Sequence, residues 1–165
     1  MTKTYDDLSA AFAGESQANR RYLAFAKKAD KDGYPQAARM FRAAAAAETI
    51  HAHSHLRAMG GIKDTTENLK EAIAGENYEH TSMYPEFVAD AEKDGDKLAL
   101  QSFKYAMEVE VTHENLFTGI LNGLSKDQEE YDYYICPVCG HTHARHAPDT
   151  CPVCGLKGER FEVVK

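Results

Sequence analysis

The chain has 165 residues, of which 43% are hydrophobic and 27% charged, and its formal net charge is −7. This length accommodates one domain, or one domain and a small module. The acidic balance argues against a nucleic-acid partner, because there is no basic stripe to neutralise phosphates.

Neither a membrane span nor a secretory signal is visible in the sequence. No run of about 18 apolar residues occurs, so we expect no transmembrane helix. The N-terminal segment MTKTYDDLSA lacks the apolar region of a signal peptide. We therefore expect a cytoplasmic protein with no membrane partner.

Residues 1–123 have helical composition, rich in Ala, Glu, Lys and Leu. Pro35 suits the first turn of a helix, and Asp64 or Thr65 can cap another. Glycine-containing breaks define four helices, each longer than the ~11–12 residues of an average helix, at about 5–30, 35–59, 65–94 and 96–122. Long helices with short connections favour an antiparallel four-helix bundle.

The helical region contains an internal repeat. The tripeptide AGE at 13–15 recurs at 74–76, an offset of 61, and KDG at 31–33 recurs at 93–95, an offset of 62. Glu48-x-x-His51 also recurs with the offset of 62, as Glu110-x-x-His113. One residue is therefore inserted between AGE and KDG in the second copy. We interpret the repeat as a duplicated helix pair with pseudo-twofold symmetry.

The C-terminal part of the chain differs in character. Residues 124–134 are polar and acidic without a helical period, so we expect a linker there. Residues 135–165 form a segment too small to fold on an apolar core, since chains below ~40 residues usually need a metal or disulfides.

The helical faces that should enter the core carry five glutamates and two histidines. Steps of three and four residues place them there: Glu15, Glu48, His51, Glu76, Glu79, Glu110 and His113. Unpaired buried carboxylates cost several kcal/mol each, and no Lys or Arg shares these faces. Two metal cations would compensate. A Glu from two helices with Glu-x-x-His from the other two is the di-iron or di-manganese arrangement.

The pattern assigns roles to these ligands. Glu48 and Glu110 are the expected bridging carboxylates, and Glu15 and Glu76 the terminal ones. His113 would bind one metal and His51 the other. Glu79 has no counterpart in the first repeat, where Ala18 stands. Charge counting suggests that His51 and Glu79 exchange at one iron when the pair changes oxidation state.

Other residues near these motifs have less certain roles. Tyr22 and Tyr84 lie two turns after the AGE glutamates, and are either core aromatics or donors to the ligating carboxylates. We expect neither His53 nor His55 to be a ligand.

All four cysteines lie in two copies of one motif, CPVCG, at Cys136, Cys139, Cys151 and Cys154. Two such turns form a tetrahedral site of four thiolates, suited to zinc or iron. The motif alone does not separate a structural zinc from a redox iron. We expect the histidines between the two motifs, His141, His143 and His146, to be exposed loop residues.

These motifs together resemble the rubrerythrin family over nearly the whole chain. The resemblance implies a ferritin-like di-iron bundle (1–123), the linker, and a rubredoxin-like domain (135–165) that holds one iron on four cysteines. It implies a peroxidase that reduces hydrogen peroxide to water at the di-iron pair. The candidate proton donors are Tyr22, Tyr84 or an unligated carboxylate. Electrons would come through the cysteine-bound iron from rubredoxin or an NAD(P)H-dependent reductase. It also implies a homodimer in which one subunit's cysteine-bound iron lies near the partner's di-iron pair.

Three alternatives stay open at this point. A ferroxidase or iron-storage protein would use the same carboxylates but needs no cysteine module. An oxygen reductase or redox sensor could use the same di-iron site. A zinc-ribbon interaction module on a metal-free helical scaffold would leave the inward glutamates without a purpose.

Overall fold

The computed structural model describes residues 2–165 and separates into two compact units. The first unit ends at Lys63, and the second runs from Asp64 to Lys165. The chain consists mainly of long helices followed by a small sheet with a cysteine cluster, so the expected fold class is confirmed. The expected domain limits at residues 123 and 134 stay predictions.

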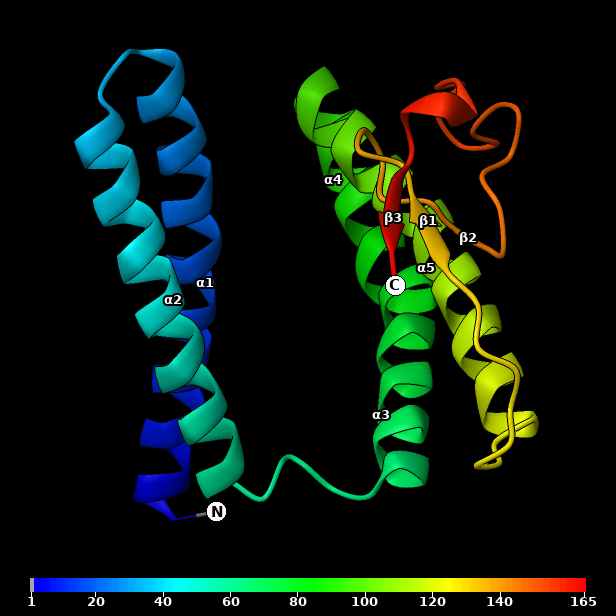
Figure 1. Cartoon of the computed structure of the whole chain (residues 1–165), viewed down its shortest axis with the longest axis horizontal. Helices are drawn as coiled ribbons and strands as arrows, with labels where there is room; N and C mark the ends of the chain where they lie inside the picture. The colour runs from blue at the N-terminus through cyan, green and yellow to red at the C-terminus, as the bar shows by residue number, and fades with distance from the viewer. Residues whose placement is uncertain (1) are drawn as a thin grey trace. The chain divides into compact units, whose positions relative to one another are not determined.

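The first unit is a helical hairpin of α1 (Lys3–Lys31) and α2 (Pro35–Ala58), shown in blue and cyan in Figure 1. The Thr2 side chain caps α1, and Pro35 occupies the first turn of α2. The Asn19 side-chain amide donates to the Ala45 carbonyl oxygen at 2.7 Å and to the Thr49 hydroxyl at 2.8 Å. These two bonds fix α1 against the middle of α2.

The second unit begins with α3 (Thr65–Tyr78), the π-helical turn η1 (Glu79–Met83) and α4 (Tyr84–Asp94), followed by α5 (Lys97–Asn122). The Asp64 carboxylate caps α3 by accepting from the Glu67 N–H at 2.8 Å. Asp96 caps α5 in the same way. The helix expected over 65–94 is thus helical throughout but changes its hydrogen bonding in the middle.

The π turn accounts for the inserted residue in the repeat. A π turn uses i→i+5 hydrogen bonds and so accommodates one more residue than an α turn. The sequence offset is 61 at the AGE motif, before η1, and 62 for every matched pair after it. The helix has therefore absorbed the extra residue at Glu79–Met83, and the helical axis continues into α4.

Each unit contains the same trio of aromatic rings, whose members are related by the offset of 62. In the first unit the Phe41 ring centroid lies 6.2 Å from Tyr22 and 5.6 Å from Phe25. In the second unit the matching distances from Phe103 are 6.3 Å to Tyr84 and 5.5 Å to Phe87. The packing supports the interpretation of a duplicated helix pair.

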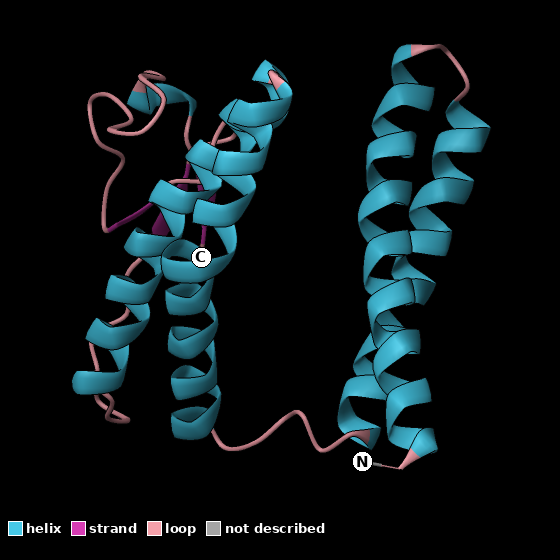
Figure 2. Cartoon of the chain, turned by 180° about the vertical axis from the view of Figure 1, so that it is seen from behind, coloured by secondary structure: helices cyan, strands magenta, loops and turns pink. Residues whose placement is uncertain are grey.

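The C-terminal module is a three-stranded antiparallel sheet of order β2-β1-β3, with β1 (Tyr133–Ile135), β2 (Thr142–Ala144) and β3 (Glu162–Val164). A short 3₁₀ turn, η2 (Gly158–Arg160), precedes β3. Strand β1 begins inside the segment expected to be a linker, since that segment includes Tyr133. β2 lies against α5, and Figure 2 shows from behind how the loops of the module lie beside the helices of the same unit.

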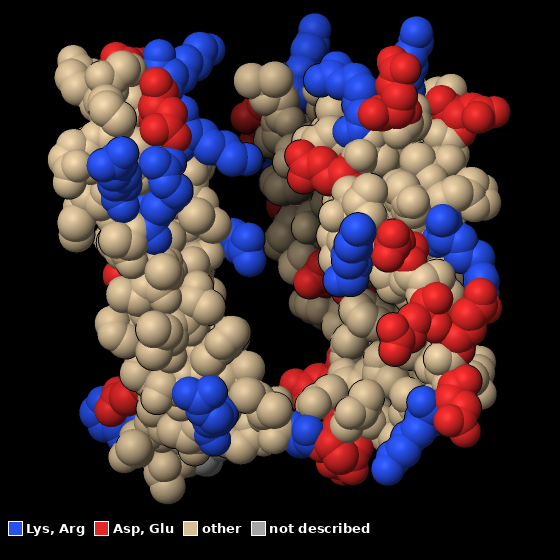
Figure 3. All heavy atoms as spheres, in the orientation of Figure 1, with Lys and Arg blue, Asp and Glu red and all other residues tan. Residues whose placement is uncertain are grey.

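The surface charge is mixed. On the face shown in Figure 3, Lys and Arg side chains stand in separate groups with Asp and Glu between them. None of the helices in the described residues has an apolar stretch of the length that a bilayer requires.

Candidate metal centres

The first unit brings Glu15 of α1 together with Glu48 and His51 of α2. His51 Nδ1 lies 3.0 Å from Glu48 Oε2 and 3.9 Å from Glu15 Oε1. One donor atom from each residue lies within 4.8 Å of the others. The helical spacing explains this cluster, because Glu48 and His51 are separated by one turn of α2.

The second unit repeats the cluster with Glu76 of α3 and Glu110 and His113 of α5. His113 Nδ1 lies 2.8 Å from Glu110 Oε2 and 3.8 Å from Glu76 Oε2. In both clusters the δ nitrogen of the histidine therefore faces two carboxylates. The side chains of the second cluster are the more buried, with His113 28% exposed against 55% for His51.

In the described part of the chain, the carboxylates of these clusters form ion pairs with His51 and His113 only. Burial raises the pKa of Glu76, and the neighbouring Glu110 carboxyl raises it further. Acidic groups gathered in this way, with an imidazole beside them, fit hard or borderline cations.

Glu79 and Tyr84 lie beside the second cluster, at the two ends of the π turn. Burial raises the pKa of Glu79, with a further contribution from the charge of Glu76. Burial also raises the pKa of Tyr84, and the charges of Glu110, Glu79 and Glu76 add to it. Tyr84 thus keeps its phenolic proton close to three carboxylates. Its counterpart Tyr22 packs against Phe25 and Phe41.

The second cluster also contacts the cysteine module. His113 Nε2 lies 2.9 Å from the hydroxyl oxygen of Thr142, which belongs to β2. Nothing in the sequence singled out Thr142, because its position beside His113 depends on how the module packs on α5. The remaining predicted non-ligands, His53 and His55, are in neither cluster.

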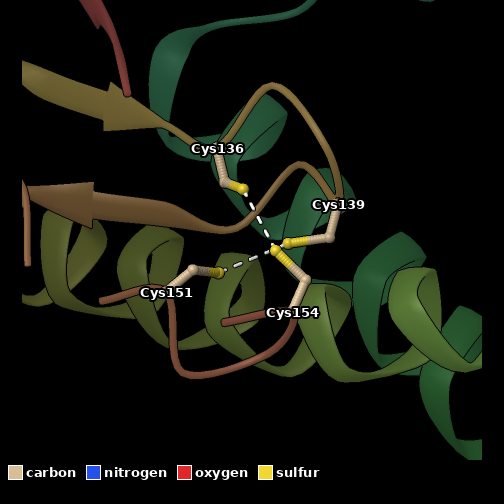
Figure 4. Close-up of side chains that lie close together, drawn as sticks. All are labelled: Cys136, Cys139, Cys151 and Cys154. Atoms are coloured by element: carbon tan, nitrogen blue, oxygen red, sulfur yellow. Dashed lines mark hydrogen bonds between the residues drawn. The ribbon is translucent and has the colours of Figure 1, made fainter. Parts of the chain in front are cut away.

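The four cysteines converge from two loops, as Figure 4 shows. The sulfur atoms of Cys136 and Cys154 lie 3.5 Å apart, and those of Cys139 and Cys151 are separated by the same distance. None of the four forms a disulfide. The two loops share one geometry, since the N–H of the glycine after each second cysteine donates to the carbonyl of the first.

The glycines in these loops are required by the backbone. Gly140 and Gly155 have φ angles of 84° and 78°, in the region that side chains disfavour. Burial raises the pKa of Cys139. Burial acts in the same direction on Cys136, but hydrogen bonds from the backbone N–H groups of Cys139 and Val138 give it a lowered pKa. Backbone donors around a set of four thiolates fit one tetrahedral ion.

The expectation that all three histidines between the two CPVCG motifs are exposed is wrong for His141. Its side chain is 6% exposed, and neither ring nitrogen has a hydrogen-bond partner in the described residues. Burial lowers its pKa and keeps the ring neutral. The reason lies in the tertiary structure. Strand β2 pairs with β1, so the chain turns back onto the sheet directly after the first CPVCG motif. The expectation is also wrong for His143, which is half-buried in β2, and it is confirmed for His146, which is exposed.

Comparison with known proteins agrees with this architecture. The family model for rubrerythrin matches residues 6–121, and the model for the rubrerythrin rubredoxin-like domain matches residues 134–162. The chain belongs to the rubrerythrin family. As a rubrerythrin it is an iron-binding oxidoreductase of a peroxidase-like family, with a di-iron site and a second iron site of four cysteines.

Curated rubrerythrins match along almost their full length. Rubrerythrin-2 of Clostridium acetobutylicum is 35% identical, covering 96% of this chain and 95% of that protein. The rubrerythrin of Porphyromonas gingivalis is 36% identical over 99% of this chain and 91% of its own. The solved structure titled as the fully reduced, all-ferrous state of nigerythrin has a TM-score of 0.60 at 30% identity, covering 99% of this chain and 88% of that one.

Proposed function

We propose that this rubrerythrin reduces hydrogen peroxide to water, with both carboxylate clusters holding the di-iron pair. The observation that carries the proposal is the repeated geometry in which a histidine Nδ1 faces two carboxylates in each unit. The reaction consumes one peroxide, two electrons and two protons, and yields two water molecules. An iron pair, when bound, supplies the two electrons.

The ligand roles follow from the chain's own symmetry. Glu48 and Glu110 are the proposed bridging carboxylates, with Glu15 and Glu76 as terminal ligands and His51 and His113 as nitrogen donors. Glu79 is the additional ligand. We keep the exchange of His51 for Glu79 as part of the proposal. Charge counting supports it, because Glu79 adds a negative charge when the iron pair becomes more positive on oxidation.

The proton supply is assigned to Tyr84. Its phenol carries a proton close to Glu76, Glu79 and Glu110. This position, and not the raised pKa, supports the role, because a raised pKa makes the phenol a weaker acid. Tyr22 is the corresponding candidate in the first unit, where its ring packs against Phe41. We propose Tyr84 as the principal donor.

The cysteine module is the proposed entry point for electrons. Four thiolates hold iron in a site that changes by one electron, whereas zinc has no redox chemistry. The external donor would be rubredoxin or an NAD(P)H-dependent reductase, as the resemblance implies. A dedicated electron entry favours turnover of an oxidant over iron storage. The cytoplasmic location expected from the sequence stays a prediction.

We also propose that the protein is a homodimer. The proposal follows from the resemblance to rubrerythrins. Among the described residues of the first unit the buried ones are alanines alone, so this hairpin is stabilised by packing on a further apolar surface, from the second unit or from a partner chain. Sedimentation equilibrium of the iron-loaded chain tests this, and a monomer at micromolar concentration would contradict it.

The function is tested by anaerobic stopped-flow mixing of the reduced, iron-loaded protein with hydrogen peroxide or with dioxygen. We expect peroxide to oxidise the protein faster than dioxygen does. The informative form carries Zn²⁺ on the four cysteines and iron at the carboxylate clusters, because it should still react once per reduced iron pair but lose steady-state turnover with a reductase. Equal rates with both oxidants would favour the oxygen reductase. Oxidation accompanied by storage of many irons per chain would favour the ferroxidase.

A further inference from the structure

Thr142 connects a candidate metal ligand to the first cysteine loop. His113 Nε2 lies 2.9 Å from Thr142 Oγ1. The same hydroxyl lies 3.2 Å from the carbonyl oxygen of Gly140, to which it donates. The Gly140 N–H in turn donates to the Cys136 carbonyl at 2.9 Å. One continuous line of hydrogen bonds therefore runs from His113 to the loop that carries two of the four thiolates.

The proton positions along this line follow from the chemistry of the groups. A carbonyl oxygen only accepts, so the single Thr142 hydroxyl proton is the one donated to Gly140. The hydroxyl oxygen must then accept from His113, which puts a proton on Nε2. The partner of one imidazole nitrogen determines whether the other is free to bind a metal. Nδ1 lies on the other side, 2.8 Å from Glu110 Oε2 and 3.8 Å from Glu76 Oε2. With the proton fixed on Nε2, a cation bound between these groups would take the Nδ1 lone pair in place of a proton.

We infer that Thr142 is a positioning residue, which holds His113 with Nε2 protonated and Nδ1 directed at the metal. This inference rests on the proposed metal-ligand role of His113. It makes the cysteine module a structural part of the second carboxylate cluster, in addition to its part in electron supply. An outer hydrogen-bond partner of a metal-bound histidine typically contributes about 10–100-fold in metal affinity.

The two histidines differ in this respect. The bonds described for His51 are to carboxylates on its Nδ1 side, and its side chain is about twice as exposed as that of His113. Among the described residues, no hydroxyl group is paired with Nε2 of His51, the equivalent histidine of the first unit. Thr142 makes His113 the fixed nitrogen ligand of the pair, and His51 serves as an internal reference for any measurement on the ring.

The test uses the full chain loaded with Zn²⁺, which is diamagnetic and supports NMR of the imidazole N–H protons. We expect the Nε2–H of His113 to exchange slowly with water and that of His51 to exchange faster. Thr142→Val removes the acceptor at nearly constant volume. It should accelerate exchange at His113 and weaken binding of one zinc ion by roughly 10–100-fold. Thr142→Ser retains the hydroxyl and should restore both values.

Two controls separate positioning from a general effect on the module. Thr150→Val makes the same change on an exposed residue between the cysteine loops and should alter neither value. A nuclear Overhauser contact between Gly140 and Val109, which lie against each other, reports whether the module stays on α5. Loss of this contact in Thr142→Val would overturn the inference, because undocking would then explain the weaker binding. Wild-type exchange and affinity in Thr142→Val would overturn it as well.

The exchange rate and the zinc affinity are measured without enzymatic turnover. Their outcome is therefore independent of whether the proposed peroxidase function is correct. A protein that binds zinc through an anchored His113 but does not reduce peroxide would contradict the peroxidase and leave the inference standing. An active peroxidase in which Thr142→Val leaves the His113 exchange rate and the zinc affinity unchanged would support the proposed function and contradict the inference about Thr142.

Discussion

The backbone N–H of Tyr84 donates to the carbonyl oxygen of Glu79, in the i→i+5 pattern of a π turn. This single bond joins two residues beside the second cluster, of which only Glu79 has no counterpart in the first unit. One is an extra carboxylate and the other a phenol that retains its proton. π turns within α-helices occur often at functional sites. The inserted residue thus lies where the duplicated halves differ chemically.

Glu79→Ala should change the reduction potential of the iron pair more than it changes the amount of iron bound. Six other ligands remain, but the oxidised pair loses a neighbouring negative charge. We expect the reduction potential to rise by at least ~59 mV, which corresponds to tenfold for a one-electron step. Spectroelectrochemical titration measures this. Glu108→Ala, an exposed change on α5, is the matched control, and an unchanged potential in Glu79→Ala would contradict the role of Glu79.

Glu76→Gln should have opposite effects with and without metal. In the metal-free protein it removes a carboxylate that is pressed against Glu110, so the midpoint of thermal unfolding should rise. In the loaded protein it removes a ligand, and the stabilisation by metal should fall. That stabilisation is ~2.7 kcal/mol when the free metal is at 100 times Kd.

Calorimetry of the wild type and of this variant, in chelator and in excess Fe²⁺ under anaerobic conditions, separates the two effects. A Glu76→Gln chain that is less stable than wild type under both conditions would mean that Glu76 is an ordinary packing residue.

Cys151→Ser should unfold the small module but leave the helices. Cys151 is 2% exposed and shares its core with Cys136 and Phe161, so loss of the tetrahedral ion removes most of what stabilises this sheet. We expect loss of thiolate-to-iron absorption and of amide protection in β1 to β3. Far-UV circular dichroism should retain its helical signal. Intact protection of the strands would show that the module folds without metal.

Tyr133 should make the protein sensitive to alkali. Burial raises its pKa from 10 to about 12, and a hydrogen bond with Tyr131 contributes. A raised pKa in the folded state gives stability that is complete below pH 10 and is lost as the pH rises toward 12. When the phenolate absorbance of the native protein is followed against pH, one tyrosine should therefore titrate near pH 12 instead of near pH 10. Tyr133→Phe should abolish that late titration, and a wild-type curve in this variant would assign it elsewhere.

The sequence alone was sufficient for the helices, the duplication and the ligand types. These features depend on local chemistry: three- and four-residue spacing places Glu48 and His51, or Glu110 and His113, on one helical face. The CPVCG loops are equally local, since two thiolates and a glycine lie within one pentapeptide. The inserted residue was also visible as a change of offset from 61 to 62.

Only the tertiary structure decided what the insertion, the histidines and the threonine do. The offset did not reveal that the extra residue forms a π turn at Glu79, because several local distortions would fit it. His141 is buried and Thr142 meets His113 because β2 pairs with β1 and packs on α5. Thr142 and His113 are separated by 29 positions in the chain, and no spacing rule along the sequence encodes a contact between them.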